Sequence, residues 1–152
     1  MIAQRRNLAF LLLTVREQVR SHFQPTFRQF GITEQQWRIL RLLDEQNELG
    51  MSQIADACLV MRPSILGIVA RMEESDLVTR REMTKDEFRR RVAVSLTPRG
   101  RALVNEIQPI FESIYRKLDA VLGPERLDEL YRVLEYTSAH LASVSENELS
   151  DQ

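Results

Sequence analysis

Cysteine is almost absent from this sequence: Cys58 is the single example among 152 residues, which also include only five glycines and five prolines. One cysteine cannot form a disulfide within the chain, as is usual for proteins of the reducing cytoplasm. So few helix-breaking residues over this length predict long helices. Apolar runs are short as well, since none approaches the ~18 residues of a membrane span. We therefore expect a cytoplasmic protein with no membrane partner.

The first eighteen residues, MIAQRRNLAFLLLTVREQ, have the basic start and apolar centre of a signal peptide. However, the apolar centre is short, no small-residue cleavage site follows it, and the apolar positions continue at helical spacing. We expect this segment to be the first helix of the mature protein.

Histidine is scarce, and the two examples, His22 and His140, lie far apart in the sequence and outside any catalytic motif. The sequence contains no cluster of metal-ligating residues, no nucleophile elbow and no phosphate-binding loop. We therefore expect no enzyme activity, no metal site and no cofactor. The net charge of −1 argues against a nonspecific nucleic-acid coat, but it allows a specific binder because the placement of charges matters more than their sum.

Residues 51–74 have the pattern of two short helices separated by a sharp break. Ser52 is a suitable N-cap for the first helix. Pro63 suits the first turn of the second helix and pushes the residue before it out of the helical region. The second helix carries one apolar stripe, formed by Ile65, Ile68, Val69 and Met72. Two helices with a tight turn are typical of a helix-turn-helix, whose second helix enters the DNA major groove.

A basic hairpin follows the second helix. Residues 92–96 alternate as in a half-buried strand, and residues 77–79 are the expected antiparallel partner. Between these strands lie Arg80, Arg81, Lys85, Arg89, Arg90 and Arg91. A hairpin rich in arginine beside a helix-turn-helix is a wing, whose guanidinium groups can reach phosphates or a narrow minor groove. The predicted fold class is mainly α, a winged helix-turn-helix with a two-stranded β wing.

A second interpretation of these features stays open. Two short amphipathic helices occur in many domains, and a run of charges is usually a solvated face. The chain could then be a helical interaction protein with no DNA function. The position of the basic hairpin directly after the second helix favours DNA binding.

Long helices flank the central unit. The first is expected over about residues 3–22 and onward past Pro25, and Gly31 ends it. A capping box at Thr33–Gln36 starts the next helix. After the hairpin, Thr97 and Pro98 begin a helix that Pro109 should kink, Gly123 ends it, and Pro124 begins the last helix, to about Ser143.

The apolar stripes of these flanking helices are too long for the central unit to cover. They predict a homodimer that presents two recognition helices to half-sites about 34 Å apart, one turn of DNA. The expected organisation is an N-terminal dimerisation helix over residues 1–32, the winged helix-turn-helix over 33–100, C-terminal dimerisation helices over 101–145 and a flexible tail over 146–152.

Three segments resemble the MarR (multiple antibiotic resistance regulator) family of winged-helix repressors, and the resemblance covers nearly the whole chain. They are TEQQW at residues 33–37, RPSILGIVARMEESDLVTR at 62–80 and RRRVAVSLTPRGRAL at 89–103. Within the family, the segments TEQQWRIL, ACLVMRPSILGIVARME and FQPTFRQF are most similar to the branch that represses operons for aromatic-acid degradation.

The resemblance implies an obligate dimer on a palindromic operator, released when a small aromatic carboxylate binds between the dimerisation and DNA-binding parts. The alternative is a regulator of the same fold that answers to stress, virulence signals or antibiotics. The resemblance also implies that Arg90 enters the minor groove. Two positions depart from the family pattern: Phe88 replaces the aspartate that usually braces the wing, and Gly67 replaces a polar or basic residue of many recognition helices.

DNA contacts are predicted on the helix-turn-helix and on the wing. Arg62 opens the recognition helix, where it is either a contact to phosphate or guanine or a solvated turn residue. Ser52 and Gln53 open the first helix, and a phosphate contact is expected at this helix start. The alternative is that these two residues only cap the helix. Arg71 is expected to pair with the wing. The predicted DNA-binding residues are Ser52, Gln53, Arg62, Ser64, Gly67, Arg89, Arg90 and Arg91.

A site for an aromatic carboxylate needs a cation among aromatic side chains. An arginine suits the carboxylate, and an indole or phenyl ring packs against the effector. Arg16 is the expected anchor, whereas Trp37 could equally be core packing and His22 a surface residue. The predicted effector-binding residues are Arg16, His22, Phe23, Trp37 and Arg38.

Cys58 lies in the helix that supports the recognition helix, on or near its apolar face. A peroxide sensor is one interpretation of a lone cysteine. Because buried cysteines are usually unreactive, we expect Cys58 to be inert packing.

Overall fold

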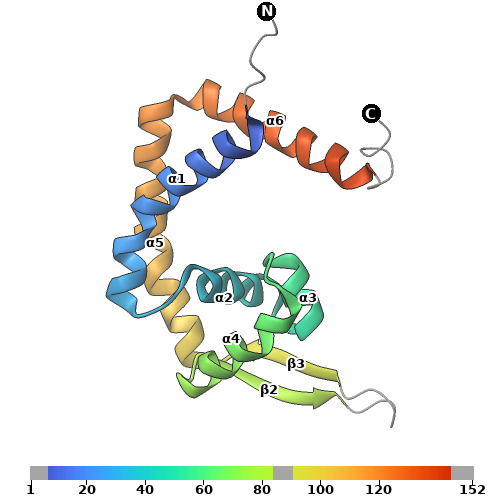
Figure 1. Cartoon of the computed structure of the whole chain (residues 1–152). Helices are drawn as coiled ribbons and strands as arrows, with labels where there is room; N and C mark the ends of the chain where they lie inside the picture. The colour runs from blue at the N-terminus through green and yellow to red at the C-terminus, as the bar shows by residue number, and fades with distance from the viewer. Residues whose placement is uncertain (1–6, 84–90, 145–152) are drawn as a thin grey trace, which may run out of the picture. The chain divides into compact units, whose positions relative to one another are not determined.

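The structure, a computed structural model, describes residues 7–83 and 91–144 (Figure 1). It is mainly α with a small antiparallel sheet, as predicted. The chain forms two compact units, residues 1–111 and 112–152. The elements, in order, are α1 (Leu8–Phe30), α2 (Glu34–Gln46), β1 (Glu48–Gly50), α3 (Met51–Ala57), α4 (Arg62–Glu74), β2 (Val78–Met83), β3 (Arg91–Leu96), α5 (Pro98–Leu122) and α6 (Pro124–Ser143).

Helix α1 continues across Pro25, as the sequence predicted. Asn7 caps its start, because the side-chain oxygen accepts a hydrogen bond from the backbone N–H of Phe10 at 3.0 Å. Gly31 ends the helix with φ at 66°, the left-handed conformation that glycine adopts at little cost. The predicted start near Ala3 lies outside the described residues.

Helix α2 begins with the predicted capping box. Thr33 Oγ1 accepts from the Gln36 N–H at 3.1 Å, and Gln36 Oε1 accepts from the Thr33 N–H at 2.9 Å. The buried face of α2 carries Trp37, Ile39, Leu40 and Leu43. The helix therefore lies in the centre of the first unit.

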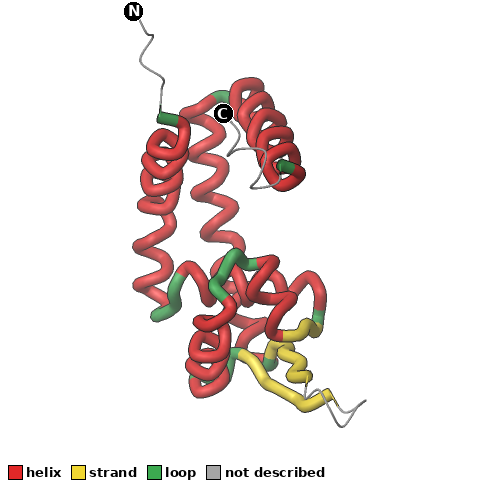
Figure 2. Tube along the Cα trace, turned by 45° about the vertical axis from the view of Figure 1, so that its right-hand side comes forward, coloured by secondary structure: helices red, strands yellow, loops and turns green. Residues whose placement is uncertain are grey.

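The sheet has three strands in the order β1-β3-β2, all antiparallel. The β2–β3 hairpin confirms the predicted wing, with Val78 opposite Leu96 and Arg80 opposite Val94. Figure 2 shows this hairpin beside the helices of the same unit. The sheet also contains β1, a strand that was not predicted, which pairs with the other edge of β3. A three-residue strand is too short for an alternating pattern, and its pairing with β3 alone defines it.

Helices α3 and α4 are bent by 107° at a short break, within the range of a helix-turn-helix. Pro63 lies in the first turn of α4, as predicted. The assignment of Ser52 as N-cap was wrong, because β1 runs directly into α3 and Gly50 takes that place. Gln53 Oε1 instead accepts from the Gly50 N–H at 2.9 Å.

No single helix of the described residues is long and apolar enough to span a membrane. The bent pair α3 and α4 has the length and composition for a span when taken together. However, its large apolar side chains are mostly enclosed by the first unit, where Ile54, Val69 and Met72 are fully buried.

The first part of α5 completes the core of the first unit. Thr97 caps the helix, since its hydroxyl accepts from the Gly100 N–H at 3.0 Å. Val104 and Ile107 are fully buried. Further along, the Phe111 ring makes edge contacts with three aromatic rings, those of Phe23, Phe27 and Trp37.

The second unit contains the end of α5 and all of α6. Gly123 separates the two helices with φ at 83°, and Pro124 opens α6, both as predicted. None of the α6 residues is buried within the chain. Its exposed large apolar side chains include Leu130, Tyr131, Val133, Leu134, Tyr136 and Leu141.

Candidate nucleic-acid interface

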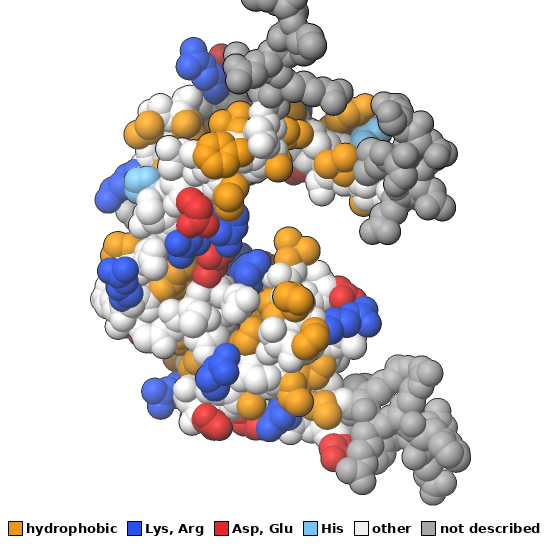
Figure 3. Space-filling model, viewed as in Figure 1, with side chains coloured by type: hydrophobic (Ala, Val, Ile, Leu, Met, Phe, Trp, Pro, Cys, Tyr) orange, Lys and Arg blue, Asp and Glu red, His pale blue; other side chains and the backbone are white. Residues whose placement is uncertain are grey.

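Helix α4 is held by one face and free on the other. The predicted apolar stripe is buried against the first unit, with Ile65, Ile68, Val69 and Met72 all at most 5% exposed. The outer face carries exposed side chains, and Figure 3 shows basic and apolar groups beside one another over α3 and α4. The exposed residues of this helix include Arg62, Ser64, Leu66, Gly67 and Arg71. A rigid helix with a free face of this kind can enter the major groove.

Arg62 is oriented by a carboxylate at the end of α3. Its Nε and Nη2 donate to the two carboxylate oxygens of Asp56 at 3.2 and 2.8 Å. This hydrogen bonding raises the pKa of the Arg62 guanidinium, which stays a cation. Both side chains are largely exposed, at 68% and 60%, so a DNA phosphate can take the place of Asp56.

We expect Arg62→Ala to weaken DNA binding and to lower the slope of log affinity against log salt by about one unit. The physical reason is the loss of one phosphate-neutralising cation. Fluorescence anisotropy at several salt concentrations measures both quantities. The control is Arg101→Ala, which removes an arginine of α5 that is likewise paired with a carboxylate, that of Asp44 on α2. An unchanged slope in the Arg62 variant would mean that this residue does not touch a phosphate.

Ser52 and Gln53 are exposed in the first turn of α3, where the prediction placed a phosphate contact. Since Gln53 Oε1 accepts from Gly50, its amide N–H groups remain the side-chain donors for a phosphate. Ser64, in the first turn of α4, is exposed as well. All three positions suit contacts to the DNA backbone, and those contacts stay predictions.

Gly67 lies in the middle of α4, and the fold itself gives no reason for glycine there. Its φ is not positive, and an added Cβ would meet only the Arg71 Nη1 atom, at 3.7 Å. Glycine in a helix interior is about 1 kcal/mol less favourable than alanine. The absent side chain therefore fits a surface that comes very close to another molecule.

We expect Gly67→Ala to raise the free energy of unfolding by about 0.5–1 kcal/mol and at the same time to weaken operator binding. The added methyl group would stand between α4 and the DNA. Chemical denaturation and a DNA titration of one preparation measure the two effects. A stabilised variant with unchanged operator affinity would show that DNA does not approach this position closely.

The base of the wing is fixed by two ion pairs. Arg80 Nε donates to Glu73 of α4 at 2.7 Å, and Arg81 Nε donates to Glu48 of β1 at 2.9 Å. These hydrogen bonds lower the pKa values of the Glu73 and Glu48 carboxyls, so both groups stay ionised at a lower pH than usual. Arg80 and Arg81 therefore serve first to attach the hairpin.

The remaining wing predictions fall largely outside the described residues. Arg89, Arg90 and Phe88 lie in the undescribed segment, and of Arg91 only the strand position opposite Met83 is described. The expectation for Arg71 was an ion pair with the wing. Among the residues that the structure describes, Glu73 makes that link, and Arg71 forms no ion pair.

The predicted effector residues fall into separate environments. Phe23 and Trp37 meet in the aromatic cluster, with ring centroids 4.8 Å from that of Phe111. Both are buried, as core packing requires. Arg16 Nη2 already donates to both oxygens of Glu34, at 3.1 and 3.3 Å. His22 is exposed on α1.

Arg38 of α2 and Cys58, at the end of α3, influence one another electrostatically. Burial raises the pKa of the Cys58 thiol, and the positive charge of Arg38 opposes this effect. The thiol is buried and protonated, which supports inert packing. The Nε of Arg38 is buried and has no hydrogen-bond partner among the described residues.

Arg41 was not among the predicted effector-binding residues, yet its guanidinium carbon lies 5.9 Å from the centre of the Trp37 ring. The two residues are four positions apart on α2 and therefore share one face. This spacing in the sequence was the signal that could have identified Arg41 as a neighbour of Trp37. A cation beside the aromatic cluster is the arrangement that an aromatic carboxylate needs.

Comparison with known proteins agrees with this architecture. The profile described as MarR family matches residues 32–91. The homoprotocatechuate degradative operon repressor of Escherichia coli is 37% identical over 129 residues, which are 85% of this chain and 86% of the relative.

Two solved structures are similar over most of the chain. The transcriptional regulator PA4135 has a TM-score of 0.81 at 35% identity, covering 89% of this chain and 98% of that one. NadR in complex with 4-hydroxyphenylacetate has a TM-score of 0.79 at 32% identity, covering 91% and 100%. The chain therefore belongs to the MarR family of transcriptional regulators, which bind DNA and are not enzymes.

Proposed function

We propose that the protein is a repressor that binds a palindromic operator as a homodimer and leaves it when a small aromatic carboxylate binds. The free outer face of α4, with the arginine-bearing β2–β3 hairpin in the same unit, carries the DNA-binding part of this proposal. Two relatives support the rest. One is named as a repressor of a homoprotocatechuate degradative operon, and the other was solved with 4-hydroxyphenylacetate.

A dimer is supported by apolar side chains that the single chain leaves exposed. The first two turns of α1 alone leave several large ones at 41–66% exposure: Leu8, Phe10, Leu11, Leu12, Leu13 and Val15. The second unit adds the exposed side chains of α6. Soluble monomers rarely expose large apolar patches, so a second copy of the chain is the expected cover for each of these two helices.

The aromatic cluster around Phe111 is the best candidate for the effector site. Glu34, Trp37 and Arg41 lie on one face of α2, at spacings of three and four residues. Arg41 is paired with Glu45 at 3.1 Å, but Glu45 is 58% exposed and can be displaced by a ligand carboxylate. Arg16 is less available, because it is already bound to Glu34. We therefore assign the carboxylate anchor to Arg41.

The release mechanism is a shift between two populations of the dimer. In one, the two α4 helices match the spacing of the half-sites, and in the other they do not. An effector that binds the second form more tightly shifts the dimer toward that form and so removes the protein from DNA. The size of this shift is limited by the difference between the effector's affinities for the two forms. The aromatic cluster suits this role because it joins α1, α2 and α5 within the first unit.

A release titration tests the effector part of the proposal. The complex between the protein and its own upstream DNA is titrated with 4-hydroxyphenylacetate, homoprotocatechuate and the hydroxybenzoates. At least one acid should release the DNA, and the matching alcohol without a carboxylate should not. If every acid leaves the complex intact, the aromatic-acid assignment is wrong while DNA binding stands, and effectors linked to stress or antibiotics become the next candidates.

Two arginine variants locate the anchor. Arg41→Gln should raise the effector concentration needed for release at least tenfold and leave DNA affinity without effector unchanged. Arg16→Gln, its matched control, should respond like the wild type. The opposite pattern would return the anchor to Arg16.

A further inference from the structure

We propose that a cavity between the end of α4 and the start of α5 is a second small-molecule site, for a compact zwitterion with a carboxylate at one end and an ammonium group at the other. The cavity has a volume of about 380 Å³. This is the size of pockets that enclose small ligands. All of its lining residues belong to the first unit. It shares no lining residue with the aromatic cluster assigned to the effector.

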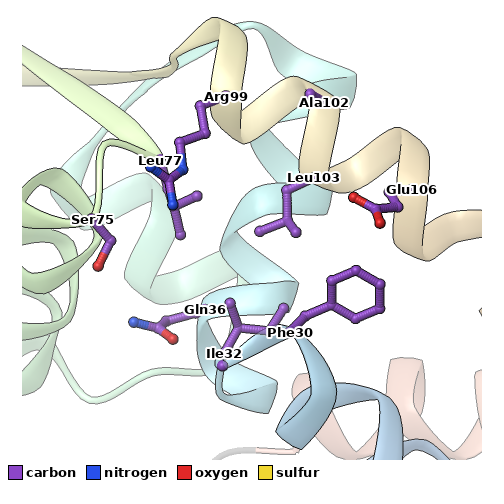
Figure 4. Close-up of a pocket in the computed structure, with 10 residues that line it drawn as sticks. Phe30, Ile32, Gln36, Ser75, Leu77, Arg99, Ala102, Leu103 and Glu106 are labelled. Carbon is purple, nitrogen blue, oxygen red and sulfur yellow. The ribbon is translucent and has the colours of Figure 1, made fainter.

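Apolar side chains form one part of the cavity lining, beside polar ones. Ile32 follows α1, Leu77 follows α4, and both are buried. Leu103 projects from α5, and Figure 4 shows Phe30, Ile32 and Gln36 facing it from the opposite side. These walls suit an apolar ligand body, such as a ring.

Two opposite charges stand at the ends of this apolar wall. Arg99 and Glu106 both line the cavity from α5 and are seven residues apart. Seven residues are two turns, so they share one face with about 10.5 Å between their Cα atoms. In Figure 4 Leu103 lies between them, and both charged groups turn toward the cavity.

Neither charge is neutralised in the part of the chain that the structure describes. The ion pairs there include neither Arg99 nor Glu106, whereas Arg101, two residues further along, pairs with Asp44 at 2.9 Å. Arg62 is likewise paired with Asp56, and Arg80 is paired with Glu73. An unpaired cation and an unpaired anion that line one cavity therefore complement a zwitterion.

The polar groups near Arg99 add hydrogen-bonding capacity at the carboxylate end. Ser75, the C-cap of α4, lines the cavity on the same side as Arg99. Gln36 uses its side-chain oxygen in the capping box, so its amide N–H groups are the donors that remain. These donors favour an anion beside Arg99 and leave the ammonium group for Glu106.

The position of the cavity gives its occupancy a consequence for DNA binding. Leu77 follows the recognition helix, and its carbonyl accepts from the Thr97 N–H at the start of α5, at 3.1 Å. A ligand that contacts Ser75, Leu77 and Arg99 would bind both sides of this connection. It would therefore stabilise the position of α4 relative to the start of α5.

Calorimetric titration of the full-length Arg41→Gln variant, which lacks the proposed effector anchor, with 4-(aminomethyl)benzoate tests the assignment. Benzoate and benzylamine, which each lack one charge, are the matched control ligands. The zwitterion should bind at least tenfold more tightly than either control. Equal affinities for the three compounds, or no binding of the zwitterion, would overturn the proposal.

Three variants locate the binding. Arg99→Gln should abolish the preference over benzylamine, and Glu106→Gln should abolish the preference over benzoate. Ala102→Trp, which places a large side chain at the exposed edge of the cavity, should block all three ligands. These variants are made in the Arg41→Gln background, because the effector site would otherwise also bind benzoate and 4-(aminomethyl)benzoate, which are aromatic carboxylates. Zwitterion binding that survives Arg99→Gln and Glu106→Gln in folded protein would show that the ligand binds elsewhere.

Discussion

Replacing Leu11 with aspartate should convert the dimer to a monomer and weaken operator binding by about 10²–10⁴-fold. Leu11 lies among the exposed apolar residues of α1 and is 53% exposed in the single chain. A carboxylate there would be buried in the apolar interface, where it has no partner. Because each half-site is bound weakly by itself, losing the dimer also loses the gain from binding two half-sites together.

Light scattering and a DNA titration measure the two parts of this prediction. The variant should have the mass of one 17.7 kDa chain, and the wild type twice that mass. Asn105→Asp is the matched control, since it adds the same charge at an exposed position of α5. It should stay dimeric and bind DNA normally. A Leu11→Asp protein that remains dimeric would show that this part of α1 is not the dimer surface.

Replacing Gly100 with alanine should lower the free energy of unfolding by about 3 kcal/mol or more. The added Cβ would stand 2.0 Å from the carbonyl oxygen of Leu77, a backbone atom that cannot rotate away. This carbonyl also accepts from the Thr97 N–H. The first turn of α5 would therefore have to move away from the strand that begins the wing.

Thermal unfolding measures this effect as a fall in Tm of roughly 6–12 °C. Gly67→Ala is the matched control, because it makes the same substitution in a helix with open space around the new methyl group. The two variants should change Tm in opposite directions. An unchanged Tm for Gly100→Ala would mean that the contact between α5 and Leu77 is not as close as the structure has it.

Local chemistry made most of the elements predictable. The capping box at Thr33 and Gln36, the left-handed Gly31 and the proline in the first turn of α4 each act within a few residues. The buried stripe of α4 repeats at helical spacing, so the sequence also indicated which face of this helix is free.

The missed features depend on contacts between distant segments. β1 exists because Glu48 to Gly50 pair with β3, more than forty residues away. Because β1 ends at Gly50 and α3 begins at Met51, Gly50 and not Ser52 is the N-cap. At the effector site, Arg16 is paired with Glu34, eighteen residues further along. No local sequence pattern in either segment indicates that Arg16 pairs with Glu34. Arg16 was therefore predicted as the carboxylate anchor from its residue type and its position among aromatic residues.

Footprinting of the protein on its own upstream DNA at low salt, together with the binding stoichiometry, tests the central claim most directly. We expect two chains per site and two protected half-sites on one face of the duplex, about 10 base pairs apart. The affinity should fall steeply as salt rises. No protection above that of an unrelated sequence, or one chain protecting one site, would contradict a dimeric regulator that reads DNA with α4.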